Sequence, residues 1–597
     1  MRRTRGYLFL CLGLARHFFA AIISKGRHYE GDIRFDCQRF GPNSPCGEGW
    51  CRCFEGGLAN CSGLASKGES LRFVPKLPRD IRTLCFGDDN ITSIDTADFF
   101  ANVTNVQALY LGFDSLTYLH PDTFRPLTNV TTLSVEGNAL LHQSDLSVVF
   151  AIPTLQRLDL RFCELGPVPD PIFRNVSAPR LRVLFLGGNR FEAVDFIAFT
   201  SLTALEKLNL DSNRIFRVDV HSVSEVREVD LSINSIYDFP KTCDGNGVSF
   251  FPELKTLDLS HNNIASLPHK VCLPNLKTLK LGRNNFDTLE TDTFNGDGFP
   301  VLRELKLDSM TPGLILHDGA FRGLRHLESV NLSDDDLVVF GMVLWAFVDC
   351  PGVTDLELNN NIFDTFAGSA SSRAKKVAGY LRPSDHTSND DRQPQRPLES
   401  VEKLGLTRSS LEDRFDLAQL IAYFPRLTHL FLSQNQLTHL PDGLFDNLRH
   451  LKHVDLSQNL IQVISERTFS PATRHRLAYL GLQNNPFLCS CDLLWFLAWV
   501  RSAPSFFFPP VNYNCEDVPG RNLQDFVLAP QSCLFSHGVY VSMVYVISLF
   551  LLLLVVVVVV FRYRWHLRLV LYEVFRGPGD VRRRHLEVGD FDYDVFV

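Results

Sequence analysis

Apolar and polar residues recur along most of this chain in one pattern. Residues 427–445, LTHLFLSQNQLTHLPDGLF, place leucines at 427, 430, 432 and 437, an asparagine at 435 and a phenylalanine at 445. The pattern L-x-x-L-x-L-x-x-N-x-L fits sixteen times, mostly at spacings of 24 to 26 residues. The matches begin at Ile81, Val106, Val130, Leu155, Leu181, Leu205, Val226, Leu254, Leu276, Leu302, Leu327, Val353, Val401, Leu427, Leu451 and Leu477. Because such a fixed period is typical of solenoids, we predict one stack of repeats rather than several globular domains.

The residue types at each position of the repeat predict its local structure. The segment L-x-L is expected to be a short strand whose alternate side chains point inward, into a core that neighbouring repeats share. Position nine requires a small polar side chain that satisfies backbone groups where the chain turns away from the strand. It is asparagine in ten repeats, and the other six carry Asp89, Asp114, Cys163, Met310, Asp335 and Ser409. Met310, followed by Thr311, Pro312 and Gly313, is expected to mark an irregular turn.

A second apolar stripe consists of phenylalanines at the outer arc of the repeats. We expect these rings to stack on the convex side as part of the core, rather than to form a binding surface. They are Phe124, Phe199, Phe294, Phe321, Phe347, Phe445 and Phe469.

Two apolar segments indicate a membrane protein. Residues 539–561 contain no charge and include ten consecutive large aliphatic residues, which favours a transmembrane helix over a buried core helix. The basic segment RYRWHLR follows, so the positive-inside rule places the C-terminal side in the cytoplasm. The N-terminus has a basic start and an apolar run, as in a secretory signal peptide. We therefore predict a single-pass type I membrane protein.

Cysteines and glycosylation motifs agree with an external N-terminal region. Of the fifteen cysteines, all but Cys11 lie between Cys37 and Cys533, which indicates an oxidising compartment. The expected glycosylation sites are Asn90, Asn102, Asn129, Asn175 and Asn331. We set the Asn60 motif aside because its middle residue is Cys61.

The repeat spacing doubles to 48 residues between Val353 and Val401. The inserted segment 367–400 is polar and rich in Ser, Pro, Arg and Asp, which is typical of an exposed loop. It is either a tolerated insertion or a regulatory loop that is cleaved or contacts a ligand.

Cysteine clusters flank the repeats and resemble the caps of leucine-rich-repeat proteins. One cluster contains Cys46, Cys51, Cys53 and Cys61, and the other contains Cys489, Cys491, Cys515 and Cys533. The resemblance implies bridges 489–515 and 491–533, and the pairing of the first cluster stays open. Zinc is the competing interpretation of paired cysteines, but a secreted segment beside a solenoid end favours disulfides. A bridge between Cys243 and Cys272 would join adjacent turns, and Cys37, Cys85 and Cys350 have no assignment.

The tail of the chain adds a second resemblance. Tyr593, Asp594, Val595 and Phe596 are similar to the opening strand of a TIR domain. With the signal peptide, the capped repeats and the single membrane span, this tail resembles a toll-like receptor. The resemblance implies an innate immune receptor that binds a microbial lipid, protein or nucleic acid. It also implies dimerisation and a cytoplasmic TIR adaptor as partner, at the plasma membrane or in endosomes.

These inferences divide the chain into six segments. They are a signal peptide (1–26), an N-terminal cap (27–80), repeats (81–488), a C-terminal cap (489–533), a transmembrane helix (539–561) and a cytoplasmic segment (562–597). The cytoplasmic segment ends within the TIR motif, so we expect a fragment of a longer receptor, with a truncated decoy as the alternative. The overall fold class is an α/β leucine-rich-repeat solenoid with parallel strands on its concave face.

Charge narrows the ligand classes. The chain's net charge of −8 includes +5 from residues 1–26 and +1 from residues 562–597, which leaves −14 for the ectodomain. This charge discourages non-specific polyanion binding at neutral pH, but a local basic patch or protonated histidines could still bind nucleic acid. The fifth repeat position faces outward and carries both charges and a glycosylation motif. Its members include Asp159, Asp230, Asp258, Glu357, Asp455, Lys280, Lys306 and Asn331.

We hypothesise that a glycan on Asn331 obstructs the middle of the concave face and moves ligand contacts to a flank. An adhesion or organiser protein with leucine-rich repeats is the alternative function, and an NAD-cleaving TIR enzyme is the third class. No catalytic constellation stands out in residues 1–597, so we expect no enzymatic activity, no catalytic residues, no metal and no cofactor.

Overall fold

The computed structural model describes residues 37, 43–62, 73–87, 91–113, 115–139, 141, 146–174, 176–311, 313–347, 349–363, 398–413, 415–502, 513–517 and 537–575. The expected signal peptide, most of the inserted segment 367–400, Cys533 and the TIR-like residues Tyr593 to Phe596 lie outside these ranges. Asn90 and Asn175 also lie outside them.

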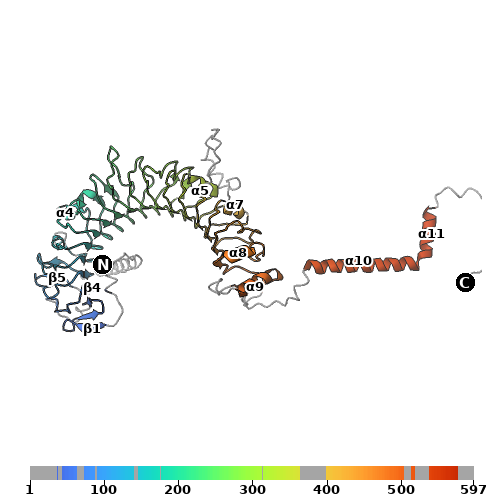
Figure 1. The fold of residues 1–597 in the computed structure, drawn as a ribbon, viewed down its shortest axis with the longest axis horizontal. Helices are drawn as coiled ribbons and strands as arrows, with labels where there is room; N and C mark the ends of the chain where they lie inside the picture. The colour runs from blue at the N-terminus through green and yellow to red at the C-terminus, as the bar shows by residue number, and fades with distance from the viewer. Residues whose placement is uncertain are drawn as a thin grey trace, which may run out of the picture.

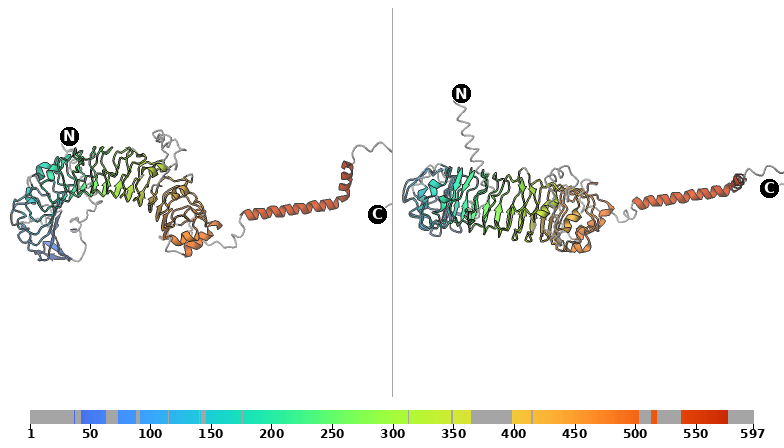
Figure 2. Two further views of the ribbon diagram at one scale, coloured as in Figure 1. Left: turned by 45° about the horizontal axis from the view of Figure 1, so that its top comes forward. Right: turned by 90° about the horizontal axis from the view of Figure 1, so that it is seen from above.

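The repeats form one curved ribbon of parallel strands on the concave side of an arc (Figure 1). Each of the sixteen motifs contributes one strand, beginning two residues after the motif starts. Two further views show the same stacking from other directions (Figure 2). The predicted leucine-rich-repeat solenoid is therefore confirmed. The 19 strands in the described part of this sheet are β1 (Asn43–Cys46), β2 (Cys51–Phe54), β3 (Leu58–Asn60), β4 (Thr83–Gly87), β6 (Ala108–Gly112), β8 (Thr132–Ser134), β9 (Arg157–Asp159), β10 (Val183–Phe185), β12 (Lys207–Asn209), β14 (Glu228–Asp230), β15 (Thr256–Asp258), β16 (Thr278–Lys280), β18 (Glu304–Lys306), β20 (Ser329–Asn331), β21 (Asp355–Glu357), β22 (Lys403–Gly405), β23 (His429–Phe431), β24 (His453–Asp455) and β25 (Tyr479–Gly481).

The register of the ribbon aligns the same repeat position in every turn. Leu430 of β23 pairs with Val454 of β24, and Val454 pairs with Leu480 of β25. All three side chains are fully buried. The inward apolar column therefore forms one continuous core, as a stack of mutually dependent repeats requires.

The inserted segment does not interrupt this ribbon. Strands β21 and β22 lie on either side of it in sequence, yet they pair directly in parallel register. The Oγ of Ser400 also donates a hydrogen bond to the carbonyl of Val353 at 2.7 Å. The chain therefore returns to the turn that it left.

Asparagines at position nine tie adjacent repeats together. The Oδ1 of Asn435 accepts the N–H groups of Ser409 (2.8 Å) and Leu411 (3.1 Å). Its Nδ2 donates to the carbonyls of Leu406 (2.8 Å) and Leu432 (2.9 Å). One buried amide thus satisfies backbone groups of two turns, which explains why the repeat requires asparagine.

Two substitutes at this position preserve part of that bonding. The thiol of Cys163 donates to the carbonyl of Val135 at 3.3 Å, and the hydroxyl of Ser409 donates to that of Leu358 at 3.0 Å. Met310 has no such donor, and its backbone N–H donates to the Oδ1 of Asp335 at 2.8 Å. Among the described residues at position nine, Met310 and Asp335 therefore depart from the asparagine pattern.

The convex side consists of short helices, short two-stranded ladders and stacked phenylalanines. The rings of Phe294, Phe321 and Phe347 stack at centroid distances of 5.7 and 4.5 Å, and Phe445 stacks on Phe469 at 5.1 Å. These rings are buried, which is the packing role expected from the sequence. The convex elements are β5 (Ser93–Ile94), β7 (Tyr118–Leu119), α3 (Ser147–Phe150), α4 (Asp170–Phe173), β11 (Ala193–Asp195), η2 (Phe196–Phe199), β13 (Arg217–Asp219), β17 (Thr288–Leu289), β19 (Ile315–Leu316), α5 (Phe340–Ala346), α7 (Leu417–Ala422) and α8 (Pro471–Arg476).

Disulfides hold both ends of the solenoid. At the N-terminal end the antiparallel strands β1, β2 and β3 cover the first repeat, while η3 (Cys491–Leu493) and α9 (Leu494–Ser502) follow the last repeat. Cys491 is disulfide-bonded, and Cys533 lies outside the described residues. Cys163 and Cys350 are buried and form no disulfide, and their thiols donate hydrogen bonds to the carbonyls of Val135 and Phe321. The described bridges are Cys37–Cys85, Cys46–Cys53, Cys51–Cys61, Cys243–Cys272 and Cys489–Cys515.

A long apolar helix follows the second cap. Helix α10 (His537–Arg562) contains the segment Tyr540–Arg562, which is long and apolar enough to cross a membrane, and none of this segment is buried against the protein. Helix α11 (Arg564–Phe575) follows directly. Together with the ectodomain, this segment supports a membrane protein.

Candidate functional site

The concave face of the ribbon is the candidate ligand-binding surface. In each strand, the fourth residue of the repeat points into the core, so the third and fifth residues face the concave side. The structure places the charged residues and the glycosylation motif found at position five on these strands. They are Asp159, Asp230, Asp258, Lys280, Lys306, Asn331, Glu357 and Asp455.

The N-terminal part of the concave face contains a buried ion cluster. The Nη2 of Arg161 lies 2.6 Å from the Oδ2 of Asp159 and 3.5 Å from the Oε2 of Glu136. The guanidinium of Arg161 also lies 5.5 Å from the centre of the Phe185 ring. The guanidinium compensates one of the two carboxylates, and all three groups are buried, so the cluster fits a structural role better than ligand attraction.

Acidic side chains occupy the next part of the face. Burial first, and then the charges of Asp258 and Asp211, raise the pKa of Asp230 to about 6. Asp258 is compensated by Lys280, whose Nζ lies 3.1 Å from its Oδ2. This part of the surface therefore carries uncompensated negative charge at Asp230 and discourages anionic ligands.

Asn331 lies on β20, in the middle of the concave face. Its Oδ1 accepts the backbone N–H of Ser333 at 3.0 Å, and the side chain is half-buried. Asn102 and Asn129 are exposed. Glycosylation at these three positions stays a prediction.

An aromatic–histidine patch covers the concave face of the last three repeats. We give this name to His429, Phe431, His453 and Tyr479. The ring of His453 stacks on those of His429 (5.3 Å) and Tyr479 (4.2 Å), and Phe431 packs against it at 5.3 Å. The patch arises because histidine, histidine and tyrosine occupy the third position of consecutive repeats, which the parallel register aligns.

Glycine allows two polar groups to pack closely at one side of this patch. A Cβ on Gly481 would stand 2.6 Å from the Oδ1 of Asp455 and 2.9 Å from the hydroxyl of Tyr479. A larger residue at this position would push the carboxylate and the phenol away from the imidazoles.

The patch is also sensitive to protons. Burial lowers the pKa of His453, the charge of His429 lowers it further, and Asp455 opposes this change. The Nδ1 of His429 lies 2.9 Å from the hydroxyl of Thr428. Because the rings stack along the ribbon, their edges rather than their faces are free to meet a ligand. Imidazole edges exchange hydrogen bonds at neutral pH and carry positive charge at lower pH.

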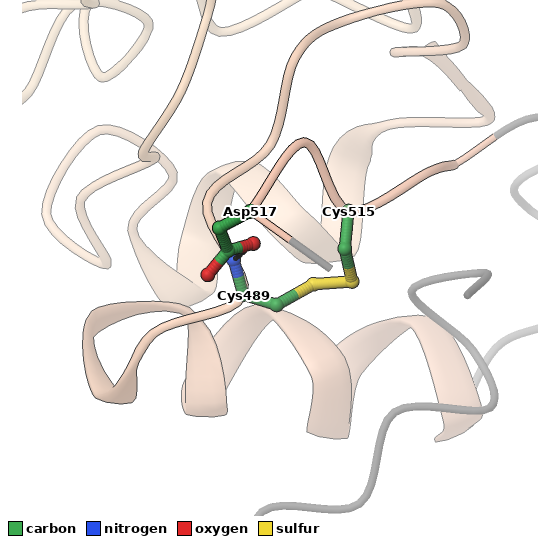
Figure 3. Close-up of side chains that lie close together, drawn as sticks. All are labelled: Cys489, Cys515 and Asp517. Atoms are coloured by element: carbon green, nitrogen blue, oxygen red, sulfur yellow. Dashed lines mark hydrogen bonds between the residues drawn. A yellow bond between two sulfur atoms is a disulfide. The ribbon is translucent and has the colours of Figure 1, made fainter. Parts of the chain in front are cut away.

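The C-terminal cap contains the one cluster among the described residues whose ligand atoms lie close enough to hold a metal ion. It consists of Cys489, Cys515 and Asp517 (Figure 3). The two sulfurs form a disulfide, and Asp517 accepts the N–H of Cys489 at 2.9 Å. The bridged sulfurs are not thiolates, so the cluster does not fit a zinc site.

Sequence reasoning missed two features of these surfaces. The bridge between Cys37 and Cys85 joins the segment before β1 to the first repeat, and the side chain of Asn60 reinforces it by donating to the carbonyl of Cys37 at 3.0 Å. The patch was missed because only the fifth repeat position was considered. A comparison of the third position in consecutive repeats would have found His429, His453 and Tyr479.

Comparisons with known proteins agree with this architecture. Residues 153–215, 252–311 and 425–487 match the family model of the leucine rich repeat. The chain is 23% identical to the CD180 antigen of Mus musculus over 542 residues, covering 79% of this chain and 78% of that protein. It is 28% identical to Toll-like receptor 2 of Boselaphus tragocamelus over 207 residues, covering 33% of this chain and 24% of that receptor.

Among solved structures, the complex of TLR13 with ssRNA13 is similar to this chain. The TM-score is 0.53 at 19% sequence identity, and the match covers 76% of this chain and 72% of that one. At this identity the likeness shows the fold alone. Leucine-rich-repeat proteins of this kind are generally non-enzymatic.

Proposed function

We propose that this chain, a leucine-rich-repeat protein with a Toll-like ectodomain, is a single-pass type I receptor of innate immunity. Its concave repeats bind a microbial ligand, ligand binding pairs two receptors, and a cytoplasmic TIR domain recruits an adaptor. The observation that carries the proposal is the capped, continuous ribbon of parallel strands followed by one exposed apolar helix. The similarity of Tyr593, Asp594, Val595 and Phe596 to a TIR strand supports the cytoplasmic part.

The aromatic–histidine patch is the ligand contact in this proposal. Its imidazole edges are suited to hydrogen-bond acceptors, and their protonation favours anionic groups such as phosphates. Single-stranded RNA offers both, so RNA is the ligand class that we favour for an acidic compartment. The acidic residues Asp230 and Asp258 keep polyanions from binding along the remainder of the face at neutral pH.

Topology is tested with two epitope tags on the full chain expressed in cells. One tag is inserted after residue 26 and the other follows Val597. The proposal expects the first tag on the outer or luminal side, protected from cytoplasmic protease, and the second tag on the cytoplasmic side. The reverse arrangement, or both tags in the cytoplasm, would contradict a type I receptor.

Ligand-driven pairing is tested with donor and acceptor fluorophores on the C-termini of the full chain. A single-stranded RNA oligonucleotide is added at neutral pH, at about pH 5.5 and at about pH 4.5, because the lowered pKa of His453 calls for a more acidic solution than an unperturbed histidine does. The proposal expects energy transfer to rise with RNA at acidic pH. A lipopeptide or a protein ligand is tested in parallel. If one of these raises energy transfer and RNA does not, the receptor function is supported and RNA is ruled out as the ligand class.

A further inference from the structure

Helix α11 begins two residues after the apolar segment Tyr540–Arg562 ends, with Tyr563 between α10 and α11. The chain turns sharply between the two helices, so that α11 runs across the axis of α10 (Figure 1, Figure 2). Because α10 crosses the membrane in the proposed topology, a helix across its axis lies along the membrane surface. The 12 residues of α11 make a helix of about 18 Å, which is too short to cross a hydrocarbon core of about 30 Å.

The side chains of α11 are mostly large, apolar and exposed. Leu567, Val570, Leu571 and Val574 recur at the spacing of one helix face. Burial of apolar surface is the dominant favourable term in folding and association, so this helix requires an apolar environment. The bilayer that contains α10 is directly adjacent. The exposed apolar residues among the described side chains of α11 are Trp565, Leu567, Leu569, Val570, Leu571, Val574 and Phe575.

Arginines give α11 a charge that suits a lipid surface. Arg564 and Arg568 are four residues apart and therefore lie on the same side of the helix. Their guanidinium carbons lie 5.8 and 5.6 Å from the centre of the Trp565 ring. Tryptophan is enriched at the headgroup level of membranes, and arginine side chains there extend to the polar surface. Residues 562–575 contain three arginines and one acid, which gives a net charge of +2 with histidine neutral.

We propose that α11 lies in the headgroup region of the cytoplasmic leaflet, where Arg564 and Arg568 contact the phosphates of anionic lipids. The membrane is the partner because α11 directly follows the helix that crosses it, and because basic residues beside a membrane span are attracted to an anionic leaflet. The choice of leaflet rests on the proposed type I topology, whereas the contact with lipid does not. This contact fixes the direction in which the chain leaves the membrane.

The depth of α11 is measured on the full chain in vesicles of phosphatidylcholine and phosphatidylserine. A nitrobenzoxadiazole fluorophore is attached at Val570→Cys, and the thiols of Cys163 and Cys350 are buried away from the reagent. The quenchers are a lipid with a nitroxide high on its acyl chain, and iodide on both sides of the membrane. We expect the lipid to quench this fluorophore and iodide to leave it unchanged. Val223→Cys is the matched control, because Val223 is 54% exposed on the solenoid and Val570 is 56% exposed. Its fluorophore should respond to iodide alone.

The role of the arginines is measured with the same fluorophore at Val570→Cys. Lipid quenching should be stronger in vesicles that contain phosphatidylserine than in phosphatidylcholine alone. With phosphatidylserine present, it should decrease at least about twofold in the double variant Arg564→Gln, Arg568→Gln. The control is Arg426→Gln, Arg449→Gln, which removes the same charge from exposed positions of the solenoid. Its lipid quenching should equal that of the parent.

Three results would overturn the proposal. Quenching by iodide at residue 570 would place α11 in water, and protection from both quenchers would place it against protein, such as a second copy of the chain. Lipid quenching that depends on neither phosphatidylserine nor the two arginines would exclude the contact with anionic lipid. The quenchers act on both leaflets, so these results do not depend on the orientation of the chain, which the epitope tags test separately.

Discussion

The carboxylate of Asp335 accepts the backbone N–H of Met310 at 2.8 Å, in the place where most repeats hold an asparagine. Its second oxygen, Oδ2, is buried without a hydrogen-bond partner. Burial raises the pKa of Asp335 to about 8, and the charges of Asp308, Asp334 and Asp336 contribute to this increase. The ladder of buried amides is therefore interrupted by an acid that folding keeps protonated.

We predict that Asp335→Asn stabilises the protein increasingly as the pH rises. In the unfolded chain this carboxyl ionises near its ordinary pKa of 3.8, whereas in the folded protein it ionises near 8. The free energy of unfolding is thus highest below about pH 4 and decreases as the pH rises towards about 8. Asparagine removes this loss, so the melting temperature of Asp335→Asn should exceed that of the wild type by a few degrees near pH 8 and hardly at all near pH 4.

Asp334→Asn is the control, because it makes the same acid-to-amide change at a neighbouring, exposed position. It should change the melting temperature little at either pH. A stabilisation by Asp335→Asn that is the same at both pH values would contradict the assignment of a buried, protonated acid.

The asparagine ladder predicts a large cost for Asn435→Ala. The substitution leaves the backbone groups of Ser409, Leu411, Leu406 and Leu432 without the partners that Asn435 provides. A loss of at least about 4 kcal/mol in the free energy of unfolding is expected, since each of the four unsatisfied groups costs about 1–3 kcal/mol. Urea unfolding measures it. Asn447→Ala, at an exposed position, should cost less than about 1 kcal/mol, and equal losses would refute the role of the ladder.

The close packing of Phe162 over Gly188 predicts that alanine destabilises the protein more at Gly188 than at Gly443. Gly188 has a φ of +68°, and a Cβ there would lie closer than 3.0 Å to the Phe162 ring. Gly443 has a similar φ of +70°, but its nearest neighbour would be 3.4 Å away. Both alanine substitutions incur backbone strain, and Gly188→Ala should cost about 1–3 kcal/mol more in chemical denaturation because the ring must move. Comparable losses in the free energy of unfolding for the two variants would show that the Phe162 ring moves aside without an energetic cost.

The repeat pattern was sufficient to predict the ribbon, its core and the phenylalanine stack. Each is governed by a short-range rule: alternation along a strand, a fixed repeat length and the burial of large apolar rings. The apolar segment that became α10 was equally evident, because nothing interrupts its hydrophobic run. The roles of Leu430, Phe321 and Asn435 follow from their positions in one repeat.

The sites depend on relations between repeats, which the pattern of a single repeat does not contain. The stacking of His453 on Tyr479 requires the parallel register, and the bridge from Cys37 to Cys85 requires the path of the cap. The glycan at Asn331 and the TIR strand are still predictions.

Binding of a fluorescent single-stranded RNA oligonucleotide to the full chain, followed by anisotropy, tests the central claim most directly. The groups that face the imidazoles of the patch are Thr428, Phe431, Asp455 and Tyr479. At about pH 5.5 we expect saturable binding that weakens at neutral pH, where imidazole side chains in general carry less charge. We expect this binding to weaken at least about tenfold in the double variant His429→Gln, His453→Gln. His450→Gln, an exposed histidine outside the patch, should bind as the wild type does. Undiminished binding by the double variant, or no binding by the wild type at either pH, would contradict the assignment of the aromatic–histidine patch as the ligand site.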